Sequence, residues 1–271
     1  MSKSIREIQQ EFSQADDCER KVLYEQYADD PRAGVTALIA KYKKQEEKLA
    51  AEIARIEAMK SYENKYRDAA FICGIDEVGR GPLAGPVVAG AVILPKDSQI
   101  LYLNDSKKLT EKRREELYEV IMREAVAVGI GIVSPARIDE INILQATYEA
   151  MREAVGKLCV EPNVLLNDAV TIPMIPPHIV QVPIIKGDAK SVSIAAASIV
   201  AKVTRDRLMT EYEEVLPGYG FASNKGYGSS EHIAALKNMD RHRSIVVVLS
   251  TISSKERKAF YGESATDRKG V

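Results

Sequence analysis

The chain has 271 residues, of which 45% are hydrophobic and 28% charged; this excludes wholesale disorder and allows one large domain or two smaller ones. The formal net charge of -1 excludes a basic surface over the whole molecule, so any nucleic-acid-binding surface must be a local patch. The 3 cysteines are far apart and odd in number, which argues against a disulfide framework and favours a reducing cytoplasm. We expect no signal peptide and no membrane association, because no apolar stretch of suitable length is present.

Residues 1–68 predict a small helical module. Apolar residues recur at helical spacing in two short segments, and residues 29–34 form a turn. Residues 36–60 then place apolar side chains on one face and Lys and Glu on the other. We expect the apolar face to pack against the neighbouring helices. The alternative is a coiled-coil partner, for which the pattern spans too few heptads.

From residue 69 onward, strands alternate with helices, which predicts an α/β domain with a mixed five-stranded sheet flanked by helices. The expected strands cover residues 71–75, 87–94, 127–133, 164–168 and 179–185, and the expected helices cover residues 105–126, 142–158 and 190–215. The first two strands are close enough in sequence to form an antiparallel pair. This domain is expected to run through residues 69–253 and to end in shorter helices. The charged residues 254–271 lack periodicity and predict a mobile tail.

Acidic residues follow three of the expected strands. Asp76 and Glu77 come after the first strand, Asp168 ends the fourth, and Asp188 follows the fifth. Functional residues gather at strand ends in α/β sheets. Carboxylates that converge there repel one another unless they bind divalent cations such as Mg²⁺ or Mn²⁺. Two such ions are a general device for cutting phosphodiesters, so the pattern predicts a two-metal nuclease site.

Each acid also has a structural interpretation. Acidic and glycine residues are common in the turns that end strands. Asp188 stands before a helix and is placed to cap it, and Asp168 is placed to cap the turn after its strand. Neighbouring residues of a strand point to opposite faces, so Asp76 and Glu77 can share one site only where the strand ends or twists.

The motif Gly79-Arg80-Gly81 indicates a close contact with another molecule, because glycine has no Cβ and tolerates positive φ. Arg80 offers a planar set of donors that suits phosphate. Among the basic residues near the acids, we expect Lys107 and Lys186 to contact a substrate. Tyr227 lies between two glycines and can stack on a sugar or base; alternatively, it closes a loop over the core.

Several motifs in the same order make this sequence similar to the type 2 ribonucleases H, the ribonuclease HII family. The resemblance covers roughly residues 69–245 and rests on residues 74–81, 105–109, 186–203, 205–206 and 225–228. It implies a ribonuclease H-like fold. It also implies a metal-dependent endonuclease that cuts the RNA strand of RNA–DNA hybrids and incises DNA beside a single embedded ribonucleotide.

The resemblance also implies roles for individual residues. The metal ligands would be Asp76, Glu77, Asp168 and Asp188. Gly79, Arg80 and Gly81 would read the ribose 2′-OH, and Tyr227 would pack on the sugar at the RNA–DNA junction. Asn167 stands where an apolar residue is expected. The alternatives are a type 3 ribonuclease H without junction preference and a protein that binds hybrids without cutting them.

Overall fold

The computed structural model describes residues 3–238. Contacts divide the chain into two compact units, residues 1–57 and residues 58–271, which we call the N-terminal unit and the sheet unit. The division falls before the predicted boundary at residue 68, because Tyr62 of the short helix α4 (Ser61–Lys65) and Tyr66, which directly follows that helix, pack with Ile72 in the sheet unit. Within residues 3–238, no helix is both long and apolar enough to cross a membrane.

The N-terminal unit is built from α1 (Ile5–Gln14), α2 (Asp17–Gln26) and most of α3 (Ala33–Met59). Capping boxes begin the first two helices, one formed by Ser4 with Glu7 and the other by Asp16 with Glu19. The predicted apolar faces meet in a small core of buried side chains, which consists of Ile8, Phe12, Tyr27, Val35 and Leu38. The helices therefore pack against one another, as the apolar pattern predicts.

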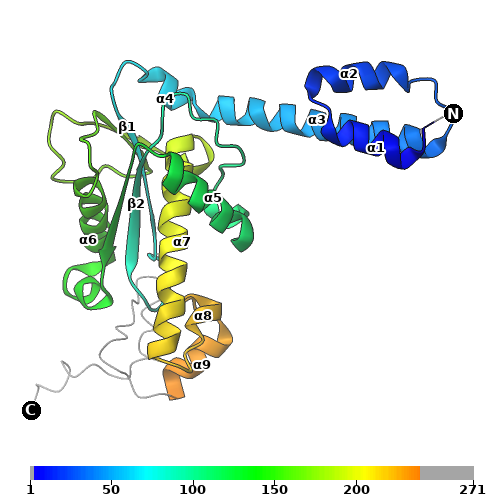
Figure 1. Cartoon of the computed structure of the whole chain (residues 1–271). Coiled ribbons are helices and arrows are strands. Elements are labelled where there is room, and N and C mark those ends of the chain that lie inside the picture. The colour runs from blue at the N-terminus through cyan, green and yellow to red at the C-terminus, as the bar shows by residue number, and fades with distance from the viewer. Residues whose placement is uncertain (1–2, 239–271) are drawn as a thin grey trace, which may run out of the picture. The chain divides into compact units, whose positions relative to one another are not determined.

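The sheet unit contains a mixed five-stranded sheet of order β3-β2-β1-β4-β5, seen edge-on in Figure 1. Its strands are β1 (Ile72–Val78), β2 (Val87–Ile93), β3 (Ala127–Val133), β4 (Val164–Asp168) and β5 (Val180–Ile184). The pairs β1–β2 and β2–β3 are antiparallel, whereas β1–β4 and β4–β5 are parallel. The mixed sheet and the antiparallel first pair were both expected from the sequence.

Two long helices cover opposite faces of the sheet (Figure 1), α6 (Pro135–Gly156) on one side and α7 (Val192–Val215) on the other. Glycines set the spacing on both sides. A Cβ at Gly74 would lie 2.0 Å from the carbonyl carbon of Ser193 in α7, and a Cβ at Gly131 would lie 1.9 Å from the carbonyl oxygen of Ala150 in α6. At these glycines, each helix therefore packs directly against the backbone of the sheet.

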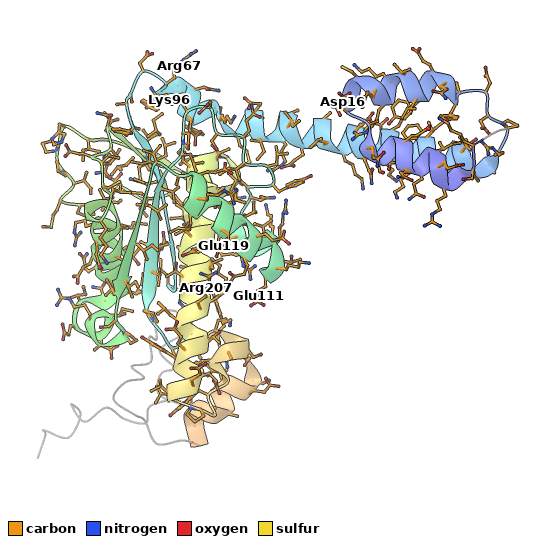
Figure 2. All side chains as sticks on the ribbon, in the orientation of Figure 1. Asp16, Arg67, Lys96, Glu111, Glu119 and Arg207 are labelled. Atoms are coloured by element: carbon orange, nitrogen blue, oxygen red, sulfur yellow. The ribbon has the colours of Figure 1, made fainter. Side chains whose placement is uncertain are left out.

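Helix α5 (Glu111–Glu124) lies beside α7, and Arg207 of α7 donates to Glu119 of α5 at 3.1 Å (Figure 2). At the far end of α7, the short helices α8 (Phe221–Asn224) and α9 (Ser230–Asn238) complete the described part of the chain. His232 of α9 is buried and contacts the carbonyl oxygen of Tyr219, a structural role rather than a metal-binding one.

Three predicted elements differ in the structure by more than two residues at one end. Strand β1 continues past its predicted end at residue 75. The predicted helix over residues 105–126 is a 3₁₀ helix, η1 (Ser106–Lys108), followed by α5, because Thr110 accepts a hydrogen bond from the backbone of Arg113 and begins a new helix. Helix α6 begins at Pro135 and breaks at Asn142, where φ is 69°. The predicted tail, residues 254–271, lies outside the described residues.

Candidate active site

Asp76 and Glu77 lie inside β1 rather than beyond its end, which corrects the predicted placement. Asp76 pairs with Gly90 of β2, and Glu77 pairs with Ala89. Asp76 is only 7% exposed, and its Oδ1 accepts a hydrogen bond from the backbone N–H of Glu77 at 2.8 Å. The side chain of Glu77 pairs with Arg80, whose guanidinium lies 3.0 Å from Glu77 Oε1. The motif arginine is therefore held against one of the two acids.

The carboxylates of β1 and β4 influence one another electrostatically. Burial raises the pKa of Asp76 well above its usual range, and the charges of Glu77 and Asp168 raise it further. Burial also raises the pKa of Glu77; Arg80 opposes this shift, whereas the charge of Asp168 adds to it. The charge of Asp168 therefore acts on both adjacent acids, although both lie within β1.

Asp168 and Asp188 are joined through the loop after β5. Asp168 is the last residue of β4, and its Oδ1 accepts a hydrogen bond of 2.7 Å from the backbone N–H of Gly187. Asp188 belongs to the 3₁₀ helix η2 (Gly187–Ala189) and does not cap α7, because Ser191 is the capping residue. Burial raises the pKa of Asp188, and the charges of Asp105 and Asp168 raise it further.

The donor chemistry at this site fits a divalent cation. All four predicted ligands are carboxylates, the hard oxygen donors that Mg²⁺ and Mn²⁺ prefer. Glu77 Oε2 is buried and has no hydrogen-bond partner among the described residues, which leaves one acceptor free for an ion. Within residues 3–238, however, no group of three or more acidic, histidine or cysteine side chains lies close enough together to hold a metal ion. The acids are neighbours, but they are not drawn together to ligand spacing.

Asn167 has a structural use that explains why it replaces an apolar residue. It is fully buried in β4, and its side-chain amide donates to Gln181 Oε1 at 3.0 Å. The same Gln181 side chain accepts from the backbone N–H of Ile172 and donates to its carbonyl oxygen, at 2.8 and 2.9 Å. Asn167 and Gln181 together hold the loop that follows Asp168, so the register of β4 is retained.

Arg205 of α7 is fully buried and holds the loop after β1. Its guanidinium donates to the carbonyl oxygens of Pro86, Ala84 and Lys225, at 2.9, 3.0 and 2.8 Å. Two of these carbonyls belong to the loop after β1, and the third to the loop that carries Tyr227. One buried cation therefore joins the two predicted substrate-binding loops.

The structure places Gly81 and Tyr227 beside each other. A Cβ at Gly81 would lie 4.0 Å from Tyr227 Cε1. The carbonyl oxygen of Gly226 accepts hydrogen bonds from the backbone N–H groups of Leu83 and Ala84, which fixes one loop on the other. Gly79 requires its small size, because its φ is +105° and a Cβ would lie 2.4 Å from the carbonyl oxygen of Pro86. Gly81 and Tyr227 are both exposed and lie on one surface, whereas Gly79 is buried against Pro86 and Arg205.

Tyr227 is 41% exposed, so it does not simply close a loop over the core. Lys202 Nζ lies 5.8 Å from the centre of its ring. The two lysines predicted to bind substrate are both exposed. Lys107 is close enough to lower the pKa of Asp188, and Lys186 directly precedes η2 in a left-handed conformation with φ 57°.

Three supporting residues were not assigned to the site from the sequence. Asp105 contributes a further carboxylate near the acids, as described above. Ser198 donates a 3.0 Å hydrogen bond to Ser106 in the buried layer, and it also contacts Asp76. Arg205 belongs to one of the motifs that carry the family resemblance, residues 205–206, but was given no role in the site. The usable signal was spacing, because Ser198, Lys202 and Arg205 follow one another at i, i+4 and i+7 on one face of α7.

Comparison with solved structures gives the class of this protein. Ribonuclease H2 from Pyrococcus horikoshii matches with a TM-score of 0.56 and 26% identity, over 65% of this chain and 92% of that chain. Bst-RNase HIII in complex with Mn²⁺ matches with a TM-score of 0.53 over 72% of this chain and 71% of that chain, a likeness of fold alone at 18% identity. The sheet and its flanking helices are those of a ribonuclease H-like protein.

Sequence comparison narrows the class to one family. The model described as Ribonuclease HII matches residues 73–247, and the model described as Ribonuclease HII N-terminal domain matches residues 4–67. Ribonuclease HII of Lachnoclostridium phytofermentans is 67% identical over 215 residues, which are 79% of this chain and 84% of that protein. Ribonuclease HII of Bacillus subtilis is 52% identical over 236 residues, which are 86% of this chain and 90% of that protein.

The chain belongs to the ribonuclease HII family. It is therefore an endonuclease with ribonuclease H activity on RNA–DNA hybrids. Of the alternatives raised from the sequence, the type 3 ribonuclease H and the non-catalytic binding protein are both wrong. Membership in the family does not by itself assign roles to individual acids, for which the geometry described above is the guide.

Proposed function

We propose that this enzyme incises DNA beside single embedded ribonucleotides, in addition to cutting the RNA strand of hybrids. The reaction depends on Mg²⁺ or Mn²⁺, with two ions held by Asp76, Glu77, Asp168 and Asp188. The observation that carries the metal assignment is the electrostatic coupling of buried Asp76 to Glu77 and Asp168, beside a buried carboxylate oxygen of Glu77 that lacks a hydrogen-bond partner among the described residues.

When bound, the cations supply the positive charge that activates water and stabilises the leaving oxygen of the phosphodiester. The protein contributes the position of the four acids. β1 and β4 are neighbouring strands, and the hydrogen bond from Gly187 orients Asp168. Arg80 holds Glu77 through one oxygen, which leaves the other oxygen for a cation.

The surface formed by Arg80, Gly81 and Tyr227, with the buried Gly79 directly before it in the chain, supports recognition of a single ribonucleotide. A ribose differs from a deoxyribose only in its 2′-OH, which both donates and accepts hydrogen bonds. Glycines allow backbone donors and acceptors to approach that hydroxyl closely. The exposed ring of Tyr227 beside Gly81 fits the neighbouring deoxyribose, where an extra hydroxyl would crowd it. Lys107 and Lys186 are both exposed and would contact phosphates of the substrate.

The proposed function is tested with a labelled DNA duplex that contains one ribonucleotide. We expect a single incision beside the ribonucleotide in Mg²⁺ or Mn²⁺ and no incision in EDTA. An all-DNA duplex of the same sequence is the control for contaminating nucleases, and an RNA–DNA hybrid reports the ribonuclease H activity. Cleavage of the hybrid without incision of the single-ribonucleotide duplex would contradict the junction part of the proposal. Equal cleavage in EDTA would contradict the metal part.

Substitution of Tyr227 separates stacking from hydrogen bonding. If ring packing on the sugar dominates, Tyr227→Phe keeps most of the preference for the ribonucleotide–deoxyribonucleotide junction. Tyr227→Ala then loses that preference by roughly tenfold, the scale of one stacking contact. The measurement is the ratio of kcat/KM for the single-ribonucleotide duplex to kcat/KM for the RNA–DNA hybrid.

The partly buried Tyr118 of α5 provides a comparison, since its ring contacts Arg207 and it belongs to neither of the predicted substrate-binding loops. Tyr118→Ala is expected to leave the junction ratio unchanged. Equal damage by Tyr227→Phe and Tyr227→Ala would show that the phenol hydroxyl, rather than the ring, is required. An unchanged ratio in Tyr227→Ala would show that the loop is structural and that this account of specificity is wrong.

A further inference from the structure

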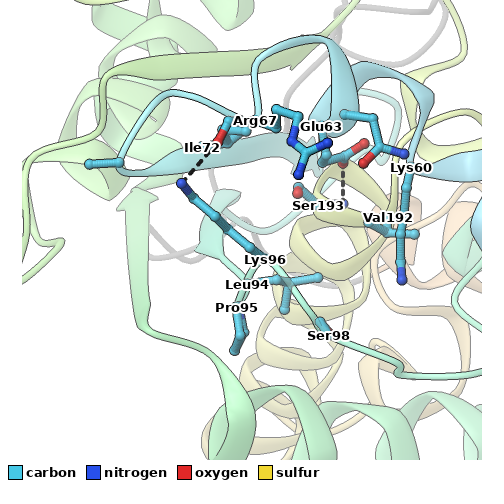
Figure 3. A pocket seen from close by; sticks show the side chains of 12 residues that line it. Lys60, Glu63, Arg67, Ile72, Leu94, Pro95, Lys96, Ser98, Val192 and Ser193 are labelled. Atoms are coloured by element: carbon cyan, nitrogen blue, oxygen red, sulfur yellow. Dashed lines mark hydrogen bonds between the residues drawn. The ribbon is translucent and has the colours of Figure 1, made fainter.

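Glu63 connects α4 to the beginning of α7. Its Oε1 accepts a hydrogen bond from the hydroxyl of Ser191 at 2.6 Å. The same oxygen accepts another from the backbone N–H of Ser193 at 3.0 Å (Figure 3). The first N–H groups of a helix have no partner within the helix, and the helix dipole favours a negative charge at this end. Glu63 therefore acts as a cap that comes from a distant part of the sequence.

From Glu63, a continuous chain of hydrogen bonds leads to the proposed metal ligands. Ser191 donates its hydroxyl to Glu63, and its backbone N–H donates to the carbonyl oxygen of Gly187 at 2.9 Å. Gly187 in turn donates its own N–H to Asp168 Oδ1 at 2.7 Å. Asp188 is the next residue in the chain. Ser191 is therefore linked to Asp168 through Gly187, and it lies three residues after Asp188.

The surroundings of Glu63 show that this contact is built into the fold. Ser191 and Ser193 are buried, and Gly187 is packed so tightly that a Cβ would lie 2.5 Å from Ile194 Cδ1. Glu63 lines a small cavity of about 60 Å³, together with Arg67, Lys96 and other residues of the sheet unit (Figure 3). Its Oε1 makes both contacts, whereas Oε2 is buried without a hydrogen-bond partner among the described residues.

We propose that Glu63 is a positioning residue for the metal site, acting through Ser191 and Gly187 on Asp168 and Asp188. This inference rests on the proposed function, because it takes these two acids to be metal ligands. It assigns a role in the catalytic centre to a residue within the part of the chain that matches the N-terminal domain model, residues 4–67. That model extends past Glu57, where the N-terminal unit ends in the structure.

The test compares Glu63→Ala with Glu63→Gln in the full-length protein. Alanine removes the acceptor, whereas glutamine keeps a side-chain oxygen that can accept from both Ser191 and Ser193. Binding of Mn²⁺ is measured by calorimetry without nucleic acid, so the readout does not depend on turnover. We expect Glu63→Ala to weaken Mn²⁺ binding by about tenfold, the usual scale for losing a group that supports a metal ligand, and Glu63→Gln to stay close to wild type.

A second measurement follows the geometry directly. Hydrogen exchange at the amide of Gly187 is expected to accelerate in Glu63→Ala but not in Glu63→Gln, because that amide is the donor to Asp168. Met151→Ala, in the buried face of α6, controls for general loss of stability. It should lower the melting temperature while leaving both Mn²⁺ affinity and exchange at Gly187 unchanged.

The outcomes separate this inference from the proposed function. Mn²⁺ binding that is unchanged in Glu63→Ala overturns the inference, as does equal weakening in Met151→Ala at a similar loss of stability. Equal damage in Glu63→Gln also overturns it, because charge rather than the hydrogen-bond acceptor would then be responsible. Wild-type protein that binds Mn²⁺ but cuts no substrate contradicts the proposed function alone. Wild-type protein that binds no Mn²⁺ contradicts both.

Discussion

Replacing Asp76 with asparagine should abolish cleavage while making the metal-free protein more stable. Asparagine has nearly the same shape but no negative charge, so it cannot help to hold a divalent cation at this position. We expect turnover to fall by on the order of 10³-fold or more, as for other groups that act directly in catalysis. Stability should move in the opposite direction, because the substitution removes a buried carboxylate that lies beside Glu77 and Asp168.

The gain in stability should depend on pH in a definite direction. Burial raises the pKa of Asp76, so the folded protein binds more protons at this group than the unfolded chain does. Its contribution to the free energy of unfolding is therefore fully present below the ordinary aspartate pKa of about 4 and is lost as pH rises through the raised value. In Asp76→Asn, the free energy of unfolding should therefore fall less steeply as pH rises. Urea unfolding in EDTA at several pH values measures it.

Asp97→Asn provides the comparison, because Asp97 is exposed in the loop after β2. It should leave cleavage unchanged. Near-full activity of Asp76→Asn in Mg²⁺ would remove Asp76 from the metal site. A pH profile of unfolding identical to that of wild type would mean that Asp76 does not carry the buried charge inferred here.

The second large effect is expected at Arg205. Arg205→Met fills similar space but leaves the carbonyl oxygens of Pro86, Ala84 and Lys225 without their buried donor. Each unpaired buried polar group costs about 1–3 kcal/mol, so we expect a loss of about 3 kcal/mol or more in the free energy of unfolding. Near the midpoint of urea unfolding, the loop that carries Tyr227 should lose its ordered conformation together with the rest of the fold.

Arg207→Met offers a close comparison on the same helix, since the side chain of Arg207 is 45% exposed and pairs with Glu115 and Glu119 on the surface. Exposed ion pairs contribute about 1 kcal/mol or less, so this change should be mild. Urea unfolding of both variants measures the difference. Under conditions where Arg205→Met remains folded, its KM for a single-ribonucleotide duplex should rise more than that of Arg207→Met. Equal stability losses in the two variants would contradict the account given for Arg205.

Much of the fold was predictable because local patterns agree with it. Alternating strands and helices predicted the mixed sheet. The small residues in the first half of α7 suit its close packing on β1 and β2. The boundaries were less predictable where a single residue decides them. Thr110 starts α5 by capping it, and Asn142 breaks α6 by adopting positive φ, choices that the hydrophobic pattern does not encode.

The candidate site was predictable in its acids but not in its supports. Asp76, Glu77, Asp168 and Asp188 stood out because carboxylates after apolar strands require an explanation. Their roles as ligands stay predictions until they are tested. The supporting contacts join residues far apart in the chain, such as Glu63 to Ser191 and Arg205 to Pro86. No spacing rule in one sequence reveals such pairs, and Glu63 was hidden within a segment expected to form a separate helical module.

Because α7 is one continuous helix, insertions and deletions within it should be tolerated less well than side-chain substitutions. Ser191 caps the start of this 24-residue helix beside Asp188, and Arg205 projects from its middle toward the loop of Tyr227. One extra residue between these points would turn everything beyond it by about 100° and shift it by about 1.5 Å. Arg205 would then face away from its carbonyl partners while every original residue was still present. The number of residues from Ser191 to Arg205 is therefore itself a requirement of the site, and relatives that vary in length are expected to do so elsewhere.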